Sequence, residues 1–282
     1  MTDDIRCGLA YLSHAVPGAP LYGIGFSLGA NQMAKCAGED GESSPLKTVI
    51  PVSAPWDFLA GHQKISSSWL HQVYSKAMGS NMRTLVTKHK KWLERHIDFD
   101  DLHFNKNLTL FEFDCLATTQ IGGHAYKTAY DFYKDASSAR LVDGVRIPLL
   151  SLASFDDPIV AVEAEPRHKA ATNPFLVFAT VSHGGHLGFF GSRFGFFELV
   201  RPRRWIAQPV MEWLSAVEAA DPQPRIPYKT SPPASAERRP KVGDEMVVVV
   251  GREDRVGFRL VGEDEFEADE AGEGEPGMTQ GL

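Results

Sequence analysis

Apolar runs alternate along the chain with segments of mixed apolar and polar residues. The runs predict buried strands at residues 20–26, 46–53, 147–153 and 175–180. The mixed segments predict helices at residues 3–15 and 28–38 and a closing helix at Trp205–Leu214, in which Trp and Leu share one face. Strands that alternate with helices are typical of parallel sheets. The pattern therefore predicts an α/β protein with a mostly parallel sheet, and residues 1–218 as its main domain.

The chain beyond residue 218 has a different composition. Residues 219–240 are rich in proline and predict a linker. Residues 241–261 predict a β-hairpin, with strands in Asp244–Gly251 and Val256–Val261. The acidic, glycine-rich end, residues 262–282, is expected to be disordered.

The charge of the chain is concentrated at this end. The net charge of the chain is −7. Residues 262–282 contain eight acidic residues and no basic one, so the remaining 261 residues hold 29 basic and 28 acidic side chains. A nearly neutral main part argues against nucleic acid as a partner. Three cysteines without a pattern fit a reducing compartment, and Cys36 is expected to be a buried structural residue. Without a signal peptide or an apolar run of about 18 residues, the chain as written is expected to be cytoplasmic.

The segment Gly25–Gly29 has the form G-x-S-x-G and stands between a predicted strand and a predicted helix. This is the setting of a nucleophile elbow, in which a sharp turn exposes a serine at the top of a sheet. Two glycines allow the turn and a close approach of helix and strand. The motif therefore makes Ser27 a candidate nucleophile.

An acid and a histidine follow in the chain order that such a nucleophile requires. The third strand runs into Asp156–Pro158, and the fourth into His183–Gly188, so that both groups lie at carboxyl ends of parallel strands. A serine hydroxyl needs a base to take its proton, and the base needs an acid to set its tautomer. His186 precedes an apolar stretch and is the expected base, whereas His183 is expected to be a polar loop residue. No third ligand accompanies the two histidines, so we expect no metal and no cofactor.

Together, Gly25–Asn31, Asp156–Pro158 and Gly184–Phe189 resemble the α/β-hydrolase family known as AB hydrolase type 4, from about residue 3 to about residue 218. That family includes fungal medium-chain fatty-acid ethyl ester synthase/esterases and animal lipid and phospholipid hydrolases. The resemblance implies an α/β-hydrolase fold with Ser27 as nucleophile, His186 as base and Asp157 as acid. Asp157 is preferred to its neighbour Asp156 because the family's acid directly precedes proline.

The resemblance also gives a role to residues 58–141, where the pattern is helical and aromatic. An insertion at this place forms a cap over the site in α/β-hydrolases. The aromatic residues of Leu110–Cys115 and Ala129–Lys134 then either line an acyl-chain pocket or pack the interior of the insertion. The sequence favours neither alternative.

Ser27 lies unusually close to the start of the chain for this fold, in which several strands precede the nucleophile. We therefore expect the N-terminal strands to be missing, together with one of two oxyanion donors, and the chain alone to be essentially inactive. The other donor is the backbone N–H of Leu28. A membrane anchor, frequent in the family, would also lie in the missing part, so the full-length form is expected to associate with a membrane surface through that segment.

The function that these expectations favour is a serine carboxylic-ester hydrolase that acts on neutral or lipid acyl esters of short or medium chain length. With the same triad an alcohol in place of water would make it an alcohol O-acyltransferase. The remaining alternative is an inactive, truncated hydrolase that acts only by binding.

Overall fold

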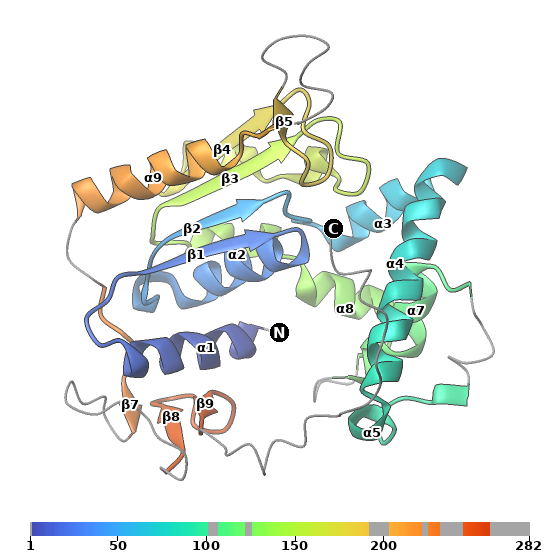
Figure 1. Ribbon diagram of the computed structural model, residues 1–282, viewed down its shortest axis with the longest axis horizontal. Helices are drawn as coiled ribbons and strands as arrows, with labels where there is room; N and C mark the ends of the chain where they lie inside the picture. Colours follow the sequence, from blue (N-terminus) through green and yellow to red (C-terminus); the bar gives the residue numbers. More distant parts are fainter. Residues whose placement is uncertain are drawn as a thin grey trace.

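The structure is a computed structural model that describes residues 2–100, 107–121, 126–191, 203–221, 225–231 and 245–259. The acidic tail at 262–282 lies outside the described residues, as do parts of the segment expected to be a linker. Figure 1 shows the arrangement of the helices and strands.

Four parallel strands form the central sheet, in the order β1 (Leu21–Phe26), β2 (Leu46–Val52), β3 (Leu149–Ser154) and β4 (Leu176–Val181). Every residue of β2 and β3 is buried, which is why these strands appear in the sequence as mostly apolar segments. β1 has partners on only one of its sides within the described residues, and its Phe26 is 52% exposed. The parallel α/β architecture predicted from the sequence is confirmed, with strand bounds that agree within about two residues.

Helices cover both faces of this sheet (Figure 1). On one face α1 (Thr2–Ala15) and α2 (Leu28–Asp40) pack Leu9, Ala30 and Ala34 against Leu46 and Val49. On the other face, α9 (Ala207–Ala220) packs Val210, Trp213 and Leu214 against apolar side chains of β2 and β3. The indole N–H of Trp213 donates to Thr48 Oγ1 at 2.8 Å, which fixes α9 across β2.

The insertion between β2 and β3 lies beside the carboxyl ends of the strands (Figure 1). Its helices are α3 (Phe58–Ser66), α4 (Trp69–Lys88), α5 (Lys90–Leu93), α7 (Leu110–Leu116) and α8 (Ala129–Ala136). Several of them start at side-chain caps: Asp57, Ser68, Thr109 and Thr128 accept hydrogen bonds from the first free N–H groups. The insertion has its own core around Val86, Leu108 and Phe113.

A small antiparallel sheet of β7 (Thr230–Ser231), β8 (Val247–Val249) and β9 (Gly257–Phe258) packs on α1. β8 and β9 are the pair that the sequence predicts as a hairpin, and β7 comes from the segment predicted as a linker. Val249, Val256 and Phe258 contact Ala10 and Cys7 of α1.

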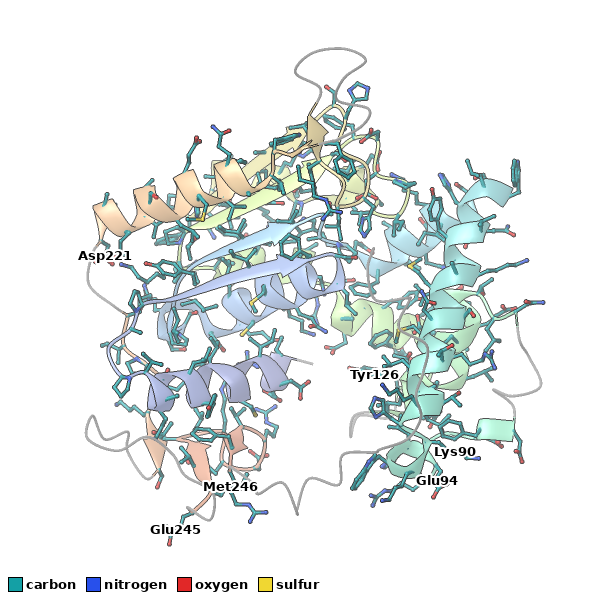
Figure 2. The ribbon with its side chains drawn as sticks, in the orientation of Figure 1. Lys90, Glu94, Tyr126, Asp221, Glu245 and Met246 are labelled. Atoms are coloured by element: carbon teal, nitrogen blue, oxygen red, sulfur yellow. The ribbon has the colours of Figure 1, made fainter. Side chains whose placement is uncertain are left out.

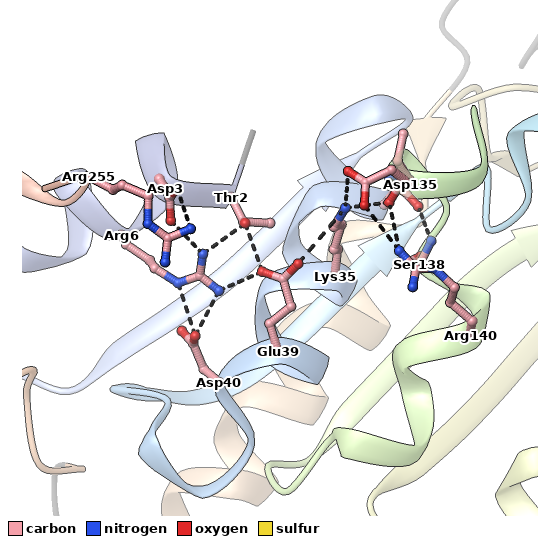
Figure 3. A network of polar contacts seen from close by, with 12 residues as sticks. Thr2, Asp3, Arg6, Lys35, Glu39, Asp40, Asp135, Ser138, Arg140 and Arg255 are labelled. Carbon is pink, nitrogen blue, oxygen red and sulfur yellow. Dashed lines mark hydrogen bonds and ion pairs between the residues drawn. The ribbon is translucent and has the colours of Figure 1, made fainter. Parts of the chain in front are cut away.

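Asp40 is the polar centre of this contact. Arg6 of α1 donates to it at 2.8 and 3.0 Å, Arg252 at 2.9 Å and the Tyr228 hydroxyl at 2.5 Å. Burial works against the charge of Asp40, but the hydrogen bonds from Arg6 and Tyr228 outweigh it and hold its pKa below the usual range. Figure 3 shows how Arg6 also reaches Glu39 and Asp3, so that α1 and α2 share one network.

Candidate active site

Ser27 occupies the tight turn between β1 and α2. Its backbone has φ 51° and ψ −121°, a conformation that L-residues rarely adopt and that marks functional turns. The Ser27 N–H donates to Val52 O at 3.0 Å, which ties the turn to the adjacent strand. A side chain at Gly25 would meet Gly29 O at 2.3 Å, so only glycine fits there. Gly29 has no such constraint, because a Cβ there would meet no atom within 4 Å.

Ser27, His186 and Asp157 form one continuous chain of hydrogen bonds. The Ser27 hydroxyl lies 2.9 Å from His186 Nε2, and His186 Nδ1 lies 2.8 Å from Asp157 Oδ2. These groups are 159 and 29 residues apart along the sequence. They meet because β1, β3 and β4 are parallel and end at the same edge of the sheet. The three residues named from the sequence are therefore brought together.

The two neighbouring aspartates have separate partners. Asp157 is buried, and its second oxygen accepts the backbone N–H groups of Ile159 and Val160 at 2.8 and 2.9 Å. Asp156 is exposed and faces the histidine loop instead, where one oxygen accepts the N–H groups of Gly184 and Gly185, both at 2.8 Å. These backbone hydrogen bonds lower the pKa of Asp156. Asp157 therefore contacts the imidazole, and Asp156 holds the loop that carries it.

The histidine loop depends on glycine at two positions. Gly185 has φ 58°, a left-handed conformation that favours glycine, and a Cβ at Gly184 would lie 2.8 Å from the Phe189 ring. The Ser154 hydroxyl donates to Gly185 O at 2.9 Å from the end of β3. His183 is exposed on the same loop, and among the described residues it is His186, not His183, that contacts the Ser27 hydroxyl.

Two further sets of contacts join the insertion to the site, and no local pattern in the sequence predicts either of them. Asn31, four residues after Ser27, is fully buried: its side chain donates to Ala136 O at 2.9 Å and accepts from Ser138 N at 3.0 Å. Lys64 of α3 donates to Val160 O at 2.9 Å, beside the acid. The insertion is thus tied to both the nucleophile helix and the acid loop.

The aromatic residues of the insertion contact one another. Phe111 stacks on His62 with ring centroids 4.3 Å apart, and Tyr133 packs on Phe58 and Phe132. Burial lowers the pKa of His62. Tyr133 also donates to the buried Asp114 at 2.7 Å, and burial raises the pKa of that carboxyl. Of the two alternatives left open by the sequence, packing inside the insertion accounts for these contacts.

Leu28 begins α2 directly after the serine. Backbone N–H groups in the first turn of a helix have no acceptor within it, and the helix dipole favours negative charge there. The position of Leu28 N–H thus suits an oxyanion that forms on Ser27.

Within the described parts of the chain, no group of three or more His, Cys, Asp or Glu side chains could hold a metal ion. A search of those same residues finds no helix with the length and apolarity needed to cross a bilayer.

Known proteins resemble this chain over part of their length. No family model matches it. It is 36% identical over 217 residues to a monoacylglycerol lipase of Saccharomyces cerevisiae, an alignment that covers 76% of this chain and 46% of the yeast protein. It is 30% identical over 190 residues to phospholipase ABHD3 of Bos taurus, with 67% and 45% covered. It is 29% identical over 208 residues to medium-chain fatty acid ethyl ester synthase/esterase 2 of Saccharomyces cerevisiae, with 67% and 46% covered. The chain spans about half the length of the curated relatives it matches.

Proposed function

Since the chain belongs to the AB hydrolase superfamily, we propose that it provides the catalytic triad of a serine carboxylic-ester hydrolase. The observation that carries the proposal is the unbroken sequence of contacts from the Ser27 hydroxyl through His186 to Asp157. Each of the three groups has the partner that its role requires.

The reaction proceeds through an acyl-enzyme. His186 Nε2 takes the Ser27 proton while Ser27 Oγ forms a bond to the ester carbonyl carbon. The negative charge that develops on the carbonyl oxygen is stabilised by the Leu28 N–H. The carbon–oxygen bond to the alcohol then breaks, and His186 returns the proton to the departing alcohol. Water, activated by the same imidazole, releases the acid and restores Ser27.

Asp157 keeps the imidazole in the tautomer that this cycle needs. With its second oxygen on the N–H groups of Ile159 and Val160, the carboxylate cannot rotate away from His186 without losing two hydrogen bonds. A buried carboxylate also stabilises the imidazolium that forms after proton transfer.

We propose neutral or lipid acyl esters of short or medium chain length as the substrate class. Support comes from the relatives, whose names refer to monoacylglycerol, phospholipid and medium-chain fatty acid ethyl ester. The nearly neutral main part of the chain also offers little attraction to a polyanion.

Ester synthesis is the second candidate. One relative is named both a synthase and an esterase. An alcohol that enters in place of water would attack the same acyl-enzyme and require no further residue. We propose hydrolysis as the main activity, because water is the more abundant acceptor.

The test is covalent labelling with a fluorophosphonate, which reacts with an activated serine. The chain is labelled in a form extended at its N-terminus to the length of its relatives, because the chain alone is expected to be essentially inactive. In that form we expect the parent to be labelled, Ser27→Ala to lose the label, and His186→Ala to label far more slowly. Ser66→Ala, which changes an exposed serine of α3, is the matched control and should label as the parent does. Label retained by Ser27→Ala would refute the assignment.

A further inference from the structure

The outer face of α4 exposes apolar side chains at its N-terminal end. Trp69 is 77% exposed, Leu70 54%, Val73 56% and Tyr74 39%. Their spacing places them on neighbouring positions of one side of the helix. The opposite side is packed, since Val86 is buried and a Cβ at Gly79 would lie 2.3 Å from Leu108 O. A cluster of this kind is unusual on a monomeric surface and marks a site of interaction.

Exposed positive charge lies at the other end of α4 and on α5. From Trp69 to Leu93 the sequence contains five basic residues and no acidic one, although the whole chain has a net charge of −7. They are Lys76, Arg83, Lys88, Lys90 and Lys91. Lys88, Lys90 and Lys91 are exposed, and Lys91 lies 5.6 Å from the ring of Trp92, which is itself 54% exposed. A helix that combines exposed tryptophan with lysine has the character of one that lies on a lipid surface.

The position of α4 relates this face to the triad. α4 lies at the outer edge of the molecule, beyond the carboxyl ends of the strands (Figures 1 and 2). Trp69 is five residues after Lys64, whose ammonium group is hydrogen-bonded to Val160 O, next to the acid loop. A bilayer that contacts the start of α4 would therefore lie near the carboxyl ends of the strands, where Ser27 also lies.

We propose that α4 and α5 form a docking surface for an anionic lipid bilayer. Trp69, Leu70 and Val73 enter the interface between headgroups and acyl chains, and the lysines contact the anionic headgroups. This proposal rests on the proposed function in one respect: docking would bring a lipid ester near the proposed triad. Binding of the chain to a bilayer does not require that the chain hydrolyse an ester.

Two other occupants fit less well. A second copy that docked through the same face would bring the exposed Lys88, Lys90 and Lys91 of both copies close together, and like charges repel. The acidic end of this chain, residues 262–282, would match the charge but contains only three large apolar side chains, Phe266, Met278 and Leu282. The apolar side chains of α4 therefore favour a lipid surface.

The experiment is co-sedimentation of the full chain with vesicles at about 0.15 M ionic strength. One set of vesicles contains phosphatidylcholine alone, and the other contains phosphatidylcholine with phosphatidylserine. We expect binding to the second set and a loss of affinity on the order of tenfold in Val73→Asp, because the new carboxylate replaces an apolar side chain that the proposal places in the bilayer. The triple change Lys88→Gln, Lys90→Gln and Lys91→Gln should weaken binding on the order of tenfold or more. Lys76 is left unchanged because it lies near Glu112 of α7.

The matched control is Met211→Asp, which places the same charge at an equally exposed apolar position on α9, 60% exposed. It should bind as the parent does, and thermal unfolding should verify that all variants are folded. Equal binding to both vesicle types, or equal binding by the two Asp variants, would overturn the proposal. A dimer in gel filtration that Val73→Asp dissociates would assign the face to a second copy instead. Labelling by fluorophosphonate is independent of vesicles, so the two proposals fail separately.

Discussion

Ser27 and the aspartates show how neighbouring residues divide the work at this site. The strain in the Ser27 backbone is tolerated because Val52 O holds its N–H and Gly25 lets α2 approach β1. Asp157 and Asp156 follow each other in sequence, yet one contacts the imidazole and the other two backbone N–H groups. We therefore expect substitutions of these two adjacent aspartates to have different effects on activity.

Asp157→Asn should retain the fold but favour the wrong tautomer of His186. We expect kcat to fall by about 10⁴-fold while KM changes little. Steady-state hydrolysis of a p-nitrophenyl ester by the form extended to the length of its relatives, with thermal unfolding as the check on folding, measures this. A loss below about tenfold would mean that Asp157 does not orient the base.

Asp156 requires a comparison of two substitutions. Asp156→Ala removes the acceptor for Gly184 and Gly185, so we expect kcat to fall by up to about 10²-fold as His186 moves. Asp156→Asn keeps an amide oxygen in the same place and should be close to the parent. Hydrogen bonding lowers the pKa of Asp156. In the parent, the hydrogen bonds from Gly184 and Gly185 to the ionised carboxylate are therefore fully present above the usual carboxyl pKa and are lost as pH falls through the lowered value. Equal losses of kcat in the Ala and Asn variants would show that the hydrogen bonds from Gly184 and Gly185 to Asp156 do not position His186.

At this scale the sequence predicts identities better than contacts. The three residues proposed as a triad stand in local turns whose glycines and proline are visible in the sequence, so they could be named. The hydrogen bonds of Asp156 could not, because they depend on how the loops after β3 and β4 meet across 28 and 29 residues. Asn31 is similar: its partners in the insertion lie 105 and 107 residues away.

At the scale of elements, the four strands and their helices follow from local patterns, whereas the docking of the C-terminal strands does not. β2 and β3 lie in mostly apolar segments of a length that suits a buried strand. β7 has only two residues and lies in a proline-rich stretch, and its place depends on distant contacts such as that of Tyr228 with Asp40, 188 residues apart. Short strands of this kind are determined by tertiary contacts rather than by propensity.

Asp40 tests this docking. Its side chain is fully buried between Arg6, Arg252 and Tyr228. Asp40→Asn removes the buried anion that Arg6 and Arg252 share and should lower the free energy of unfolding by about 3 kcal/mol near neutral pH. Since the pKa of Asp40 is lowered in the fold, its contribution is present above the usual carboxyl pKa and is lost as pH falls through the lowered value. The difference between parent and variant should therefore shrink in acid.

Urea unfolding at several pH values measures both effects. Asp143→Asn is the control, because its ion pair with Lys169 is 57% exposed at the carboxylate and should contribute less than about 1 kcal/mol. A similar change in the two variants, or a gap that widens in acid, would show that Asp40 does not hold the C-terminal strands in place.

At the scale of the whole molecule, the described sheet is covered on its faces but open along β1. Ile24 is 37% exposed and Phe26 52%, and β2 is the only strand hydrogen-bonded to β1 among the described residues. An uncovered apolar edge strand is a template for pairing with another chain. The chain in isolation should therefore associate as its concentration rises.

Ile24→Lys should reduce this association, because a charged side chain on an edge strand opposes pairing. Sedimentation velocity over a range of concentrations would follow it, with Met211→Lys on α9 as the matched control at another exposed apolar position. We expect a smaller weight-average mass for Ile24→Lys and no change for Met211→Lys. Ile24 lies in β1, three residues before Ser27, so fluorophosphonate labelling of this variant in the form extended to the length of its relatives would also show whether the elbow tolerates the change. A parent chain that stays monomeric at every concentration would mean that β1 is not available for pairing, whatever its exposure.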